Sequence, residues 1–331
     1  MLKNSFLESL LLKIINLIIK KKKITISQIG TSVNISNLSV IERLRELRKD
    51  YSFPIEFDNN DCRLTYSVDL LEKQKIEKIL SNYSFRLSYF LTLSSTNSYF
   101  LNLKKYDEIV DNNWVCISEH QSNGRGTSNK SWVSPFAQNL YFSVQIILEK
   151  KYQFFSNISL FVALLVAKSM KKIFPDLTFL IKWPNDIYIQ GKKVSGILIE
   201  LKSCKEKKIN RIIIGIGINI NMFPCPLLSI KKSWTSLSLE LKKRIDRQKM
   251  TEQLLELIIP PLQNIQNLDY NWLKKSYEKY DYLFNKEISL FAREKFLMKG
   301  HYVGINEHGQ LLLRRKNKVF TFSSAEVSVL H

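Results

Sequence analysis

Residues 139–220 alternate short β-rich runs with one helix that is apolar on nearly every face, and this pattern constrains the fold most. The strand-like runs are 139–148, 177–183, 186–190, 193–202 and 210–220. After the first run comes SLFVALLVAKSMKKIF (159–174), which has almost no polar stripe. A helix of this kind must be buried between a sheet and its neighbours. We therefore expect a mixed α/β domain over residues 84–280.

The chain is strongly basic. Fifty Lys and Arg against thirty Asp and Glu give a net charge of +20 over 331 residues, a length that suits two or three domains. This charge favours an anionic partner such as nucleic acid. Lys, Asn and Ile are frequent throughout, however, so the charge also fits Lys-rich solvated surfaces without a function. The four Cys form no CxxC pair and the His do not cluster with them, so we expect no Cys/His metal site and a cytoplasmic protein.

The first 68 residues have the pattern of a winged helix-turn-helix domain. LLLKIINLIIKKKK (10–23) is too short and too interrupted to span a membrane and predicts an amphipathic helix. Residues 25–50 predict two short helices, with Ser36 as the N-cap of the second, and 53–67 predicts a strand, a turn and a strand. In such a domain a helix-turn-helix of about 26–45 would read DNA. The candidate DNA-binding residues are Ser36, Asn37, Ser39, Arg43 and Arg45.

The same N-terminal unit could also be a protein-interaction module or a structural brace. The first turn of its second helix has no Lys or Arg, and Glu42 would repel phosphate. Residues 69–83 read as a polar linker helix. Residues 281–331 show short strands and turns without a helix pattern, which predicts a small SH3-like β-barrel.

Four stretches of the central region place glycine or small polar residues where a core strand would have apolar ones. They are SSTNS (94–98), EHQSNGRGTSNKSW (119–132), KWPNDIYIQGKKVSGILIE (182–200) and GIGININ (215–221). Gly124 and Gly126 allow close approach of the backbone to a ligand, and Arg125 can bind a carboxylate or phosphate bidentately. Gly196 leaves room for a group to lie against its strand. Because G-x-G-x-x-G and P-loop patterns are absent, a Rossmann or Walker site is not expected.

Each stretch alone is also explained by a turn or by packing, but their order resembles that of a known family. STN, GRG, W-x-S-P, NLYFS, KWPNDIYI, GILIE and GIGIN follow one another as in the biotin protein ligases. Together with the predicted terminal domains, nearly the whole chain resembles the bifunctional type, which is also a repressor of the biotin operon. The resemblance implies a mixed-sheet central domain of the class II synthetase/biotin-ligase type.

The resemblance also implies an activity. Such enzymes activate biotin with ATP and Mg²⁺ to biotinyl-5′-AMP and transfer biotin to one lysine of the biotin carboxyl carrier protein of acetyl-CoA carboxylase. Biotinyl-5′-AMP would also be the corepressor of a ligand-dependent homodimer that binds operator DNA.

By resemblance, the candidate site residues fall into three groups. The biotin group is Ser95, Thr96, Asn97, Gln121, Gly124, Arg125, Gly126, Thr127, Lys193 and Gly196, of which Lys193 and Arg125 are also the candidate catalytic residues. The ATP group is Trp132, Asn185, Asp186, Asn219 and Trp234. Asn185 and Asp186 would hold Mg²⁺ together with the phosphates.

The chain departs from the family pattern in the GRG loop. Thr127 stands where an arginine is usual and Asn129 where a glycine is usual, so we expect the adenylate to be held less tightly. Leu330 stands where repressor-type relatives tend to have a basic residue. Three alternatives stay open: a DNA-binding sensor that no longer ligates, a ligase whose winged helix is only a brace, and a lipoate-type ligase.

Overall fold

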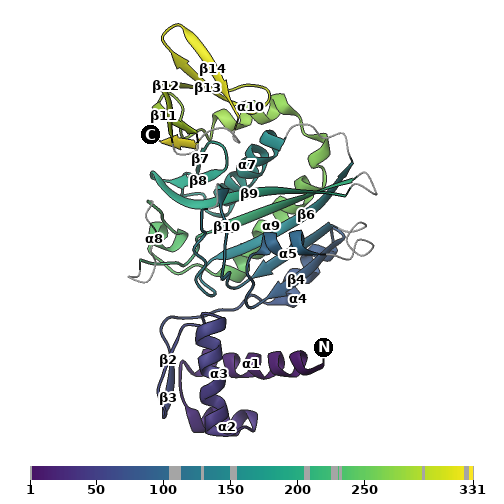
Figure 1. Ribbon diagram of the computed structural model, residues 1–331, viewed down its shortest axis with the longest axis vertical. Helices are drawn as coiled ribbons and strands as arrows, with labels where there is room; N and C mark the ends of the chain where they lie inside the picture. Colours follow the sequence, from purple (N-terminus) through teal and green to yellow (C-terminus); the bar gives the residue numbers. More distant parts are fainter. Residues whose placement is uncertain are drawn as a thin grey trace.

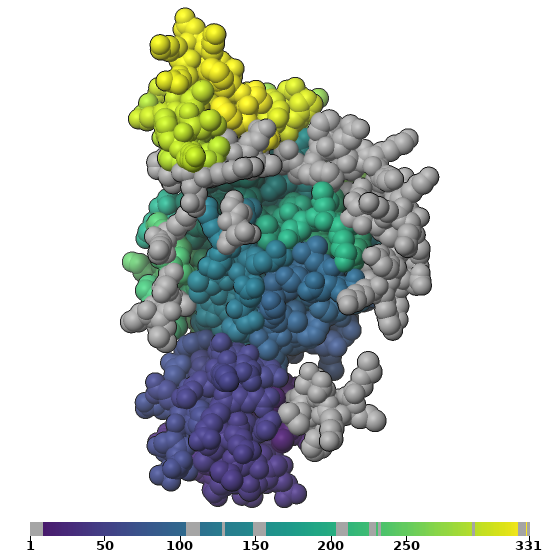
Figure 2. Space-filling view, viewed as in Figure 1, coloured from purple at the N-terminus to yellow at the C-terminus, as the bar shows by residue number. Residues whose placement is uncertain are grey.

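The computed structural model has three parts along its long axis, with the N-terminal unit at one end and the C-terminal sheet at the other (Figure 1). In the space-filling view the N-terminal residues (purple) form a lobe below the blue and green central part (Figure 2). The structure describes residues 2–103, 113–127, 130–149, 155–204, 209–224, 230, 233–292, 295–323 and 328–330.

The N-terminal unit packs three helices against a small antiparallel sheet. Its elements are α1 (Leu2–Lys21), β1 (Lys23–Thr25), α2 (Ile26–Val33), α3 (Asn37–Asp50), β2 (Ile55–Phe57) and β3 (Asp61–Leu64), with strand order β1-β3-β2. Ser36 caps α3, as predicted, by accepting a hydrogen bond from the Ser39 amide. Val40, Leu44 and Leu47 of α3 are buried with the apolar stripe of α1 in a core of their own. The three helices and the β2–β3 hairpin predicted for residues 10–67 are therefore present in the predicted order, and β1, between α1 and α2, was not predicted.

A seven-stranded mixed sheet forms the centre of the molecule. Its strands are β4 (Phe85–Phe90), β5 (Asn113–Ser118), β6 (Leu140–Glu149), β7 (Leu180–Lys182), β8 (Asp186–Ile189), β9 (Lys192–Cys204) and β10 (Ile209–Ile218), in the order β4-β5-β6-β10-β9-β8-β7. The β4–β5 pair is parallel, and the other neighbours are antiparallel. The five strands predicted in 139–220 are all present, which confirms a mixed α/β fold.

Helices cover both faces of this sheet. On one face α7 (Phe155–Ile173) and α9 (Arg247–Gln263) pack against the strands and each other, with α4 (Lys73–Ser81) beside α9. On the other face α5 (Thr96–Asn102) lies over β5, β6 and β10. The remaining helices in the described part of the chain are α8 (Leu237–Leu241), the 3₁₀ turn η2 (Ile265–Asn267) and α10 (Tyr270–Glu278). Most described residues of α7 are buried and its exposed ones are Lys168, Lys171 and Lys172, which agrees with the interpretation of its largely apolar sequence.

The C-terminal part is a five-stranded antiparallel sheet that shares the central core. Its strands are β11 (Glu287–Ala292), β12 (Lys295–Ile305), β13 (Leu311–Arg315), β14 (Lys318–Phe322) and β15 (Ser328–Leu330), in the order β14-β13-β12-β11-β15. The Trp183 indole N–H donates to the Gly309 carbonyl oxygen at 3.0 Å. A Cβ on Gly309 would lie 2.2 Å from Asn157 Oδ1, so only glycine fits this turn. The turn at Gly309 therefore packs against the KWPND segment and holds its Trp183 side chain in place.

Two local expectations need correction. The segment expected as a polar linker helix, α4, buries Ile76 and Leu80 in the central core. The SSTNS run was interpreted as small polar residues in place of the apolar ones of a core strand, but Ser95 is instead the N-cap of α5, which begins at Thr96. Small polar residues fit both positions, so the sequence alone does not separate them. Among the described residues, no helix has the length and apolar content to cross a bilayer.

Candidate functional site

Two adjoining cavities open where β9 and β10 meet the N-terminus of α5 and the 121–132 loop. The smaller has a volume of about 50 Å³, and the larger about 450 Å³. Both are lined by Gly126, Thr127, Trp132, Asp186 and Lys193. The smaller cavity is also lined by Ser95, Thr96, Asn97, Gln121, Arg125, Asn185 and Gly196. Asn219 and Trp234 line the larger one. Of the residues that sequence analysis selected in the central region, Gly124 alone lines neither cavity.

The floor of the smaller cavity is a hydrogen-bonded cluster of uncharged polar side chains. Gln121 Oε1 accepts from the Thr96 amide at 2.9 Å. Ser143, on the neighbouring strand β6, lies within hydrogen-bond distance of Thr96 Oγ1 (2.7 Å) and Asn97 Oδ1 (2.6 Å). A Cβ on Gly215 would lie 2.4 Å from Asn97 Oδ1, so this glycine makes room for the asparagine. The cluster is therefore rigid and can present donors and acceptors to an uncharged polar group.

The GRG loop is held in a narrow turn by its own backbone. The Gly126 amide donates to the Lys130 carbonyl (2.6 Å), and the Trp132 amide donates to the Gly124 carbonyl (2.8 Å). A Cβ on Gly124 would lie 2.5 Å from the Trp132 carbonyl oxygen, whereas a Cβ on Gly126 would make only ordinary van der Waals contact, 3.5 Å from the Lys130 carbonyl oxygen. Gly124 is therefore required for packing within the loop, and the sequence had suggested approach to a ligand instead. Asn129 lies outside the described residues.

Arg125 points to the floor of the site and is paired there with Glu200. Its Nη1 and Nη2 lie 2.9 and 2.8 Å from the two carboxylate oxygens. Asn97 Nδ2 donates to the same carboxylate at 2.8 Å. Glu200 therefore joins the GRG loop to the polar floor, and the charge of Arg125 is compensated in this state.

Lys193 stands at the boundary between the two cavities. Its Nζ lies 2.6 Å from Asp186 Oδ1 and 5.2 Å from the centroid of a Trp132 ring. An anion that enters either cavity can therefore meet the Lys193 ammonium, whose ion-pair partner among the described residues is Asp186. This arrangement can bind and stabilise negative charge that moves from one cavity to the other.

The Trp132 ring lies flat against strands β9 and β10. Added Cβ atoms on Gly196 and Gly217 would lie 3.0 and 2.6 Å from ring atoms of Trp132. Its indole nitrogen is buried and has no hydrogen-bond partner among the residues that the structure describes. The glycines on these strands therefore leave room for a planar group, and in this state that group is Trp132.

The two polar side chains of KWPND, Asn185 and Asp186, have different roles: one makes a structural hydrogen bond, and the other faces the cavities. Asn185 is buried and donates to the Ile197 carbonyl (2.7 Å), so its amide holds two strands together. Asp186 faces both cavities. Among the described residues, no group of three His, Cys, Asp or Glu could hold a metal ion. One carboxylate fits Mg²⁺ only if phosphate oxygens and water supply most of its ligands, as is common for this ion.

Several site residues were missed from the sequence, among them Gly215, which makes room for Asn97. Glu200 is the last residue of the GILIE motif, and a charged residue in this largely apolar strand could have indicated a role in the site. Ser143 places a hydroxyl in the apolar run NLYFSVQIIL, and it is fully buried. Gly217 belongs to the noted GIGIN run but was not assigned to the site.

The candidate DNA-binding residues lie on or next to α3. Ser36 and Ser39 are joined as cap and capped residue, Arg43 is ion-paired with Glu46, and Arg45 is exposed. Asn37 is exposed, beside Leu38, which is 67% exposed. The exposed start of this helix therefore presents an amide and an apolar side chain, with basic residues further along.

Comparisons with known proteins agree with this geometry. Residues 89–219 match the Biotin/lipoate A/B protein ligase family. The chain is 27% identical over 303 residues to "Bifunctional ligase/repressor BirA" of Escherichia coli (strain K12), covering 91% of both chains. It is likewise 27% identical to the protein of that name in Bacillus subtilis (strain 168), covering 91% of this chain and 92% of that one.

A solved structure supports the same assignment. "Biotin protein ligase from Aquifex aeolicus in complex with biotin and ATP" superimposes with a TM-score of 0.62 at 28% identity, covering 74% of this chain and 98% of that one. Residues 89–219 therefore form a domain of the biotin/lipoate protein ligase family, and over most of its length the chain is similar to bifunctional ligase/repressors and to a biotin protein ligase.

Proposed function

We propose that this protein is an ATP-dependent biotin protein ligase that forms biotinyl-5′-AMP and transfers biotin to a lysine of a biotin carboxyl carrier protein, that of acetyl-CoA carboxylase. The observation that carries this proposal is the junction of two cavities at Lys193. On one side lies the uncharged polar floor of Thr96, Asn97 and Gln121, which suits a ureido group. On the other side lies the larger cavity with Trp234 and Asn219, which suits a nucleotide.

The chemistry follows from this arrangement. The carboxylate oxygen of biotin attacks the α-phosphorus of ATP, a C(O)–O–P bond forms, and pyrophosphate leaves. Two anions must approach each other, so Lys193 at the boundary stabilises the charge that develops. Mg²⁺, held by Asp186, phosphate oxygens and water, would neutralise the leaving pyrophosphate. The amine of the acceptor lysine then attacks the acyl carbon, AMP leaves, and the amine proton passes to solvent.

The second step requires position more than a strong base, because the acyl-adenylate is already activated. We expect no covalent enzyme intermediate. The GRG loop would cover the adenylate and exclude water, which would otherwise hydrolyse the mixed anhydride.

Pyrophosphate release measured with biotin and Mg-ATP, but without a carrier protein, tests the first step. A stoichiometric burst of pyrophosphate with one bound biotinyl-5′-AMP per chain is expected, and its absence would contradict the proposal. A lipoate-type ligase is separated by competition: excess lipoate should not lower the burst.

The N-terminal unit favours a second function, repression of transcription. Helices α2 and α3 joined by a tight turn, followed by the β2–β3 hairpin, have the order of a winged helix-turn-helix domain. In this proposal biotinyl-5′-AMP is the corepressor of a homodimer that binds an operator palindrome. The "ligase/repressor" names of the relatives support it.

Footprinting at low salt on a palindromic operator, with and without biotinyl-5′-AMP, tests repression. Failure to protect the operator would leave a ligase whose N-terminal unit is a brace. That reading is favoured by the lack of Lys or Arg in the first turn of α3.

We also propose four regions in a cytoplasmic protein: 1–68 winged helix, 69–83 a connecting segment whose helix α4 packs on the central core, 84–280 catalytic and 281–331 SH3-like.

A further inference from the structure

An ion pair between Arg247 on α9 and Glu119 after β5 is almost completely removed from solvent. The exposed fractions of the two side chains are 1% and 0%. Desolvation of two charges opposes folding, and apolar side chains of similar volume often serve stability as well or better. We therefore look for the role of this ion pair in the groups that it orients, and not in a contribution to folding stability.

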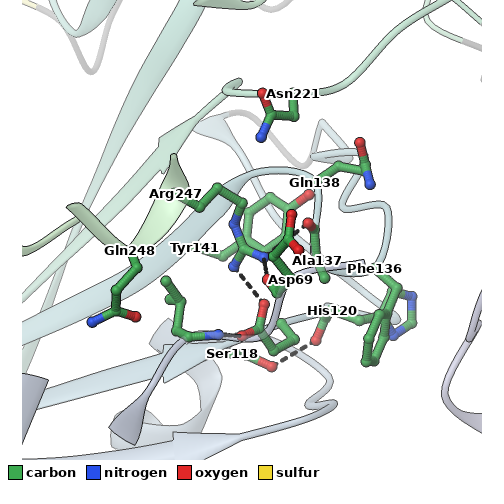
Figure 3. A network of polar contacts seen from close by, with 12 residues as sticks. Asp69, Ser118, His120, Phe136, Ala137, Gln138, Tyr141, Asn221, Arg247 and Gln248 are labelled. Carbon is green, nitrogen blue, oxygen red and sulfur yellow. Dashed lines mark hydrogen bonds and ion pairs between the residues drawn. The ribbon is translucent and has the colours of Figure 1, made fainter. Parts of the chain in front are cut away.

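The pair orients three backbone segments. Arg247 Nη1 donates to the carbonyl oxygens of Asp69 (2.7 Å) and Ala137 (2.8 Å). Glu119 Oε1 accepts from the Leu71 amide (2.7 Å) and from the Tyr89 hydroxyl (2.6 Å). Figure 3 shows the Arg247 side chain reaching toward Asp69 and Ala137. The segment that leaves the N-terminal unit, the end of β5 and the loop before β6 thus meet at one buried pair.

One of these segments leads directly into the ligand site. Glu119 lies two residues before Gln121, whose side chain accepts from the Thr96 amide. The other end of the Gln121 side chain, Nε2, donates to Ser134 Oγ at 3.2 Å. Gln121 therefore depends for its position on both the end of β5 and the loop before β6.

The same loop leads into the N-terminal unit. The Phe136 ring packs edge-on against Phe53, with centroids 5.2 Å apart, and is buried in the N-terminal core. The Tyr66 hydroxyl donates to the Phe136 carbonyl at 3.0 Å.

Ala137 has a left-handed φ of +52°, which is unfavourable for a residue with a side chain. Its amide donates to the Glu119 carbonyl, and its own carbonyl accepts from Arg247. The pair therefore holds a strained backbone in place between the site and the N-terminal unit.

We propose that Glu119 and Arg247 are positioning residues for the ligand site, which act through Gln121 and the 134–138 loop. Through them, ligand binding in the site is coupled to the packing of residues 65–72 on the central domain. Ligand binding should therefore stabilise this packing, and the packing should in turn raise the affinity for the ligand. This inference rests on the proposed function in one respect: it takes biotin as the ligand.

The test is the neutral double variant E119Q/R247M, which removes both charges together and retains side-chain volume and an acceptor for Leu71 and Tyr89. Calorimetry with biotin gives Kd, and hydrogen exchange reports the segments 65–72 and 119–123. We expect Kd to rise about tenfold, while the urea midpoint stays close to that of wild type. Exchange should accelerate in both segments together.

Two single variants serve as matched controls. Tyr89→Phe removes one hydrogen bond to the same carboxylate and leaves the pair intact. Arg244→Gln breaks contacts of the same linker, to Asp69 Oδ2 and the Ser67 carbonyl, at a site where Arg244 and Asp69 are 40% and 68% exposed. The first should change neither readout, and the second should accelerate exchange in 65–72 alone.

A biotin Kd within twofold of wild type in the double variant, or faster exchange confined to 65–72, overturns the inference. If the double variant does not fold, Arg247→Lys decides by the same readouts, since one ammonium cannot reproduce the planar fork of arginine. A wild-type protein that does not bind biotin refutes the proposed function instead, and the exchange comparison then decides the positioning role alone.

Discussion

Glu200→Gln tests the contact that holds the GRG loop on the floor of the site. The wild-type carboxylate accepts two bonds from Arg125, at 2.9 and 2.8 Å, and one from Asn97, at 2.8 Å. Hydrogen bonds to charged groups contribute about 1.5–3 kcal/mol. The side chains of Arg125 and Glu200 are 35% and 21% exposed, so solvent screening places the loss near the lower end, about 1.5 kcal/mol. Biotin affinity should therefore fall roughly tenfold.

Calorimetry with biotin measures this loss, and Glu46→Gln is the matched control. Glu46 pairs with Arg43 in the N-terminal unit at a similar exposure, 23% and 26%, but far from the cavities. The control should leave Kd unchanged. The reasoning is refuted if the Glu200 variant binds biotin within twofold of wild type, or if both variants weaken binding equally.

Three further predictions follow from single residues. Lys193→Met should lower the rate of adenylate formation roughly 100-fold and leave biotin Kd within a few-fold, as measured by pyrophosphate release; an unchanged rate would exclude its catalytic role. Thr127→Arg should slow the release of biotinyl-5′-AMP in single-turnover experiments, and unchanged retention would remove the explanation based on the missing arginine. Burial raises the pKa of Asp281 from 3.8 to about 6, so the folded state binds this proton more tightly, and the associated stability is lost as pH rises from about 4 through 6. Asp281→Asn should therefore gain stability relative to wild type between pH 4 and 7, by up to about 3 kcal/mol in urea unfolding, and a pH-independent difference would contradict this.

The strands and helices that could be predicted from the sequence are those whose hydrophobic pattern repeats every few residues. Strand alternation in 139–220 and the apolar surface of α7 are local properties, and both correspond to the structure. Helix α9 was not assigned, although it covers the sheet, because Pro260 and Pro261 lie within its last turn and obscure its period.

The site was predictable where its residues belong to a contiguous motif. Asp186, Lys193 and Gly196 lie together because one hairpin of neighbouring strands carries them. Glu119 and Arg247 could not be found in this way, since they are 128 residues apart and only the tertiary fold brings the first residue of α9 to the residue that follows β5. The role of Gly217 likewise depends on Trp132, which comes from another segment.

The most direct test of the proposed ligase activity is intact-mass spectrometry of a biotin carboxyl carrier domain after incubation with the protein, biotin and Mg-ATP. We predict one added biotinyl group on a single lysine, with no addition when ATP is omitted or when that lysine is replaced by arginine. A carrier domain that stays unmodified while the wild-type protein remains folded would contradict the assignment of these two cavities to biotin and ATP.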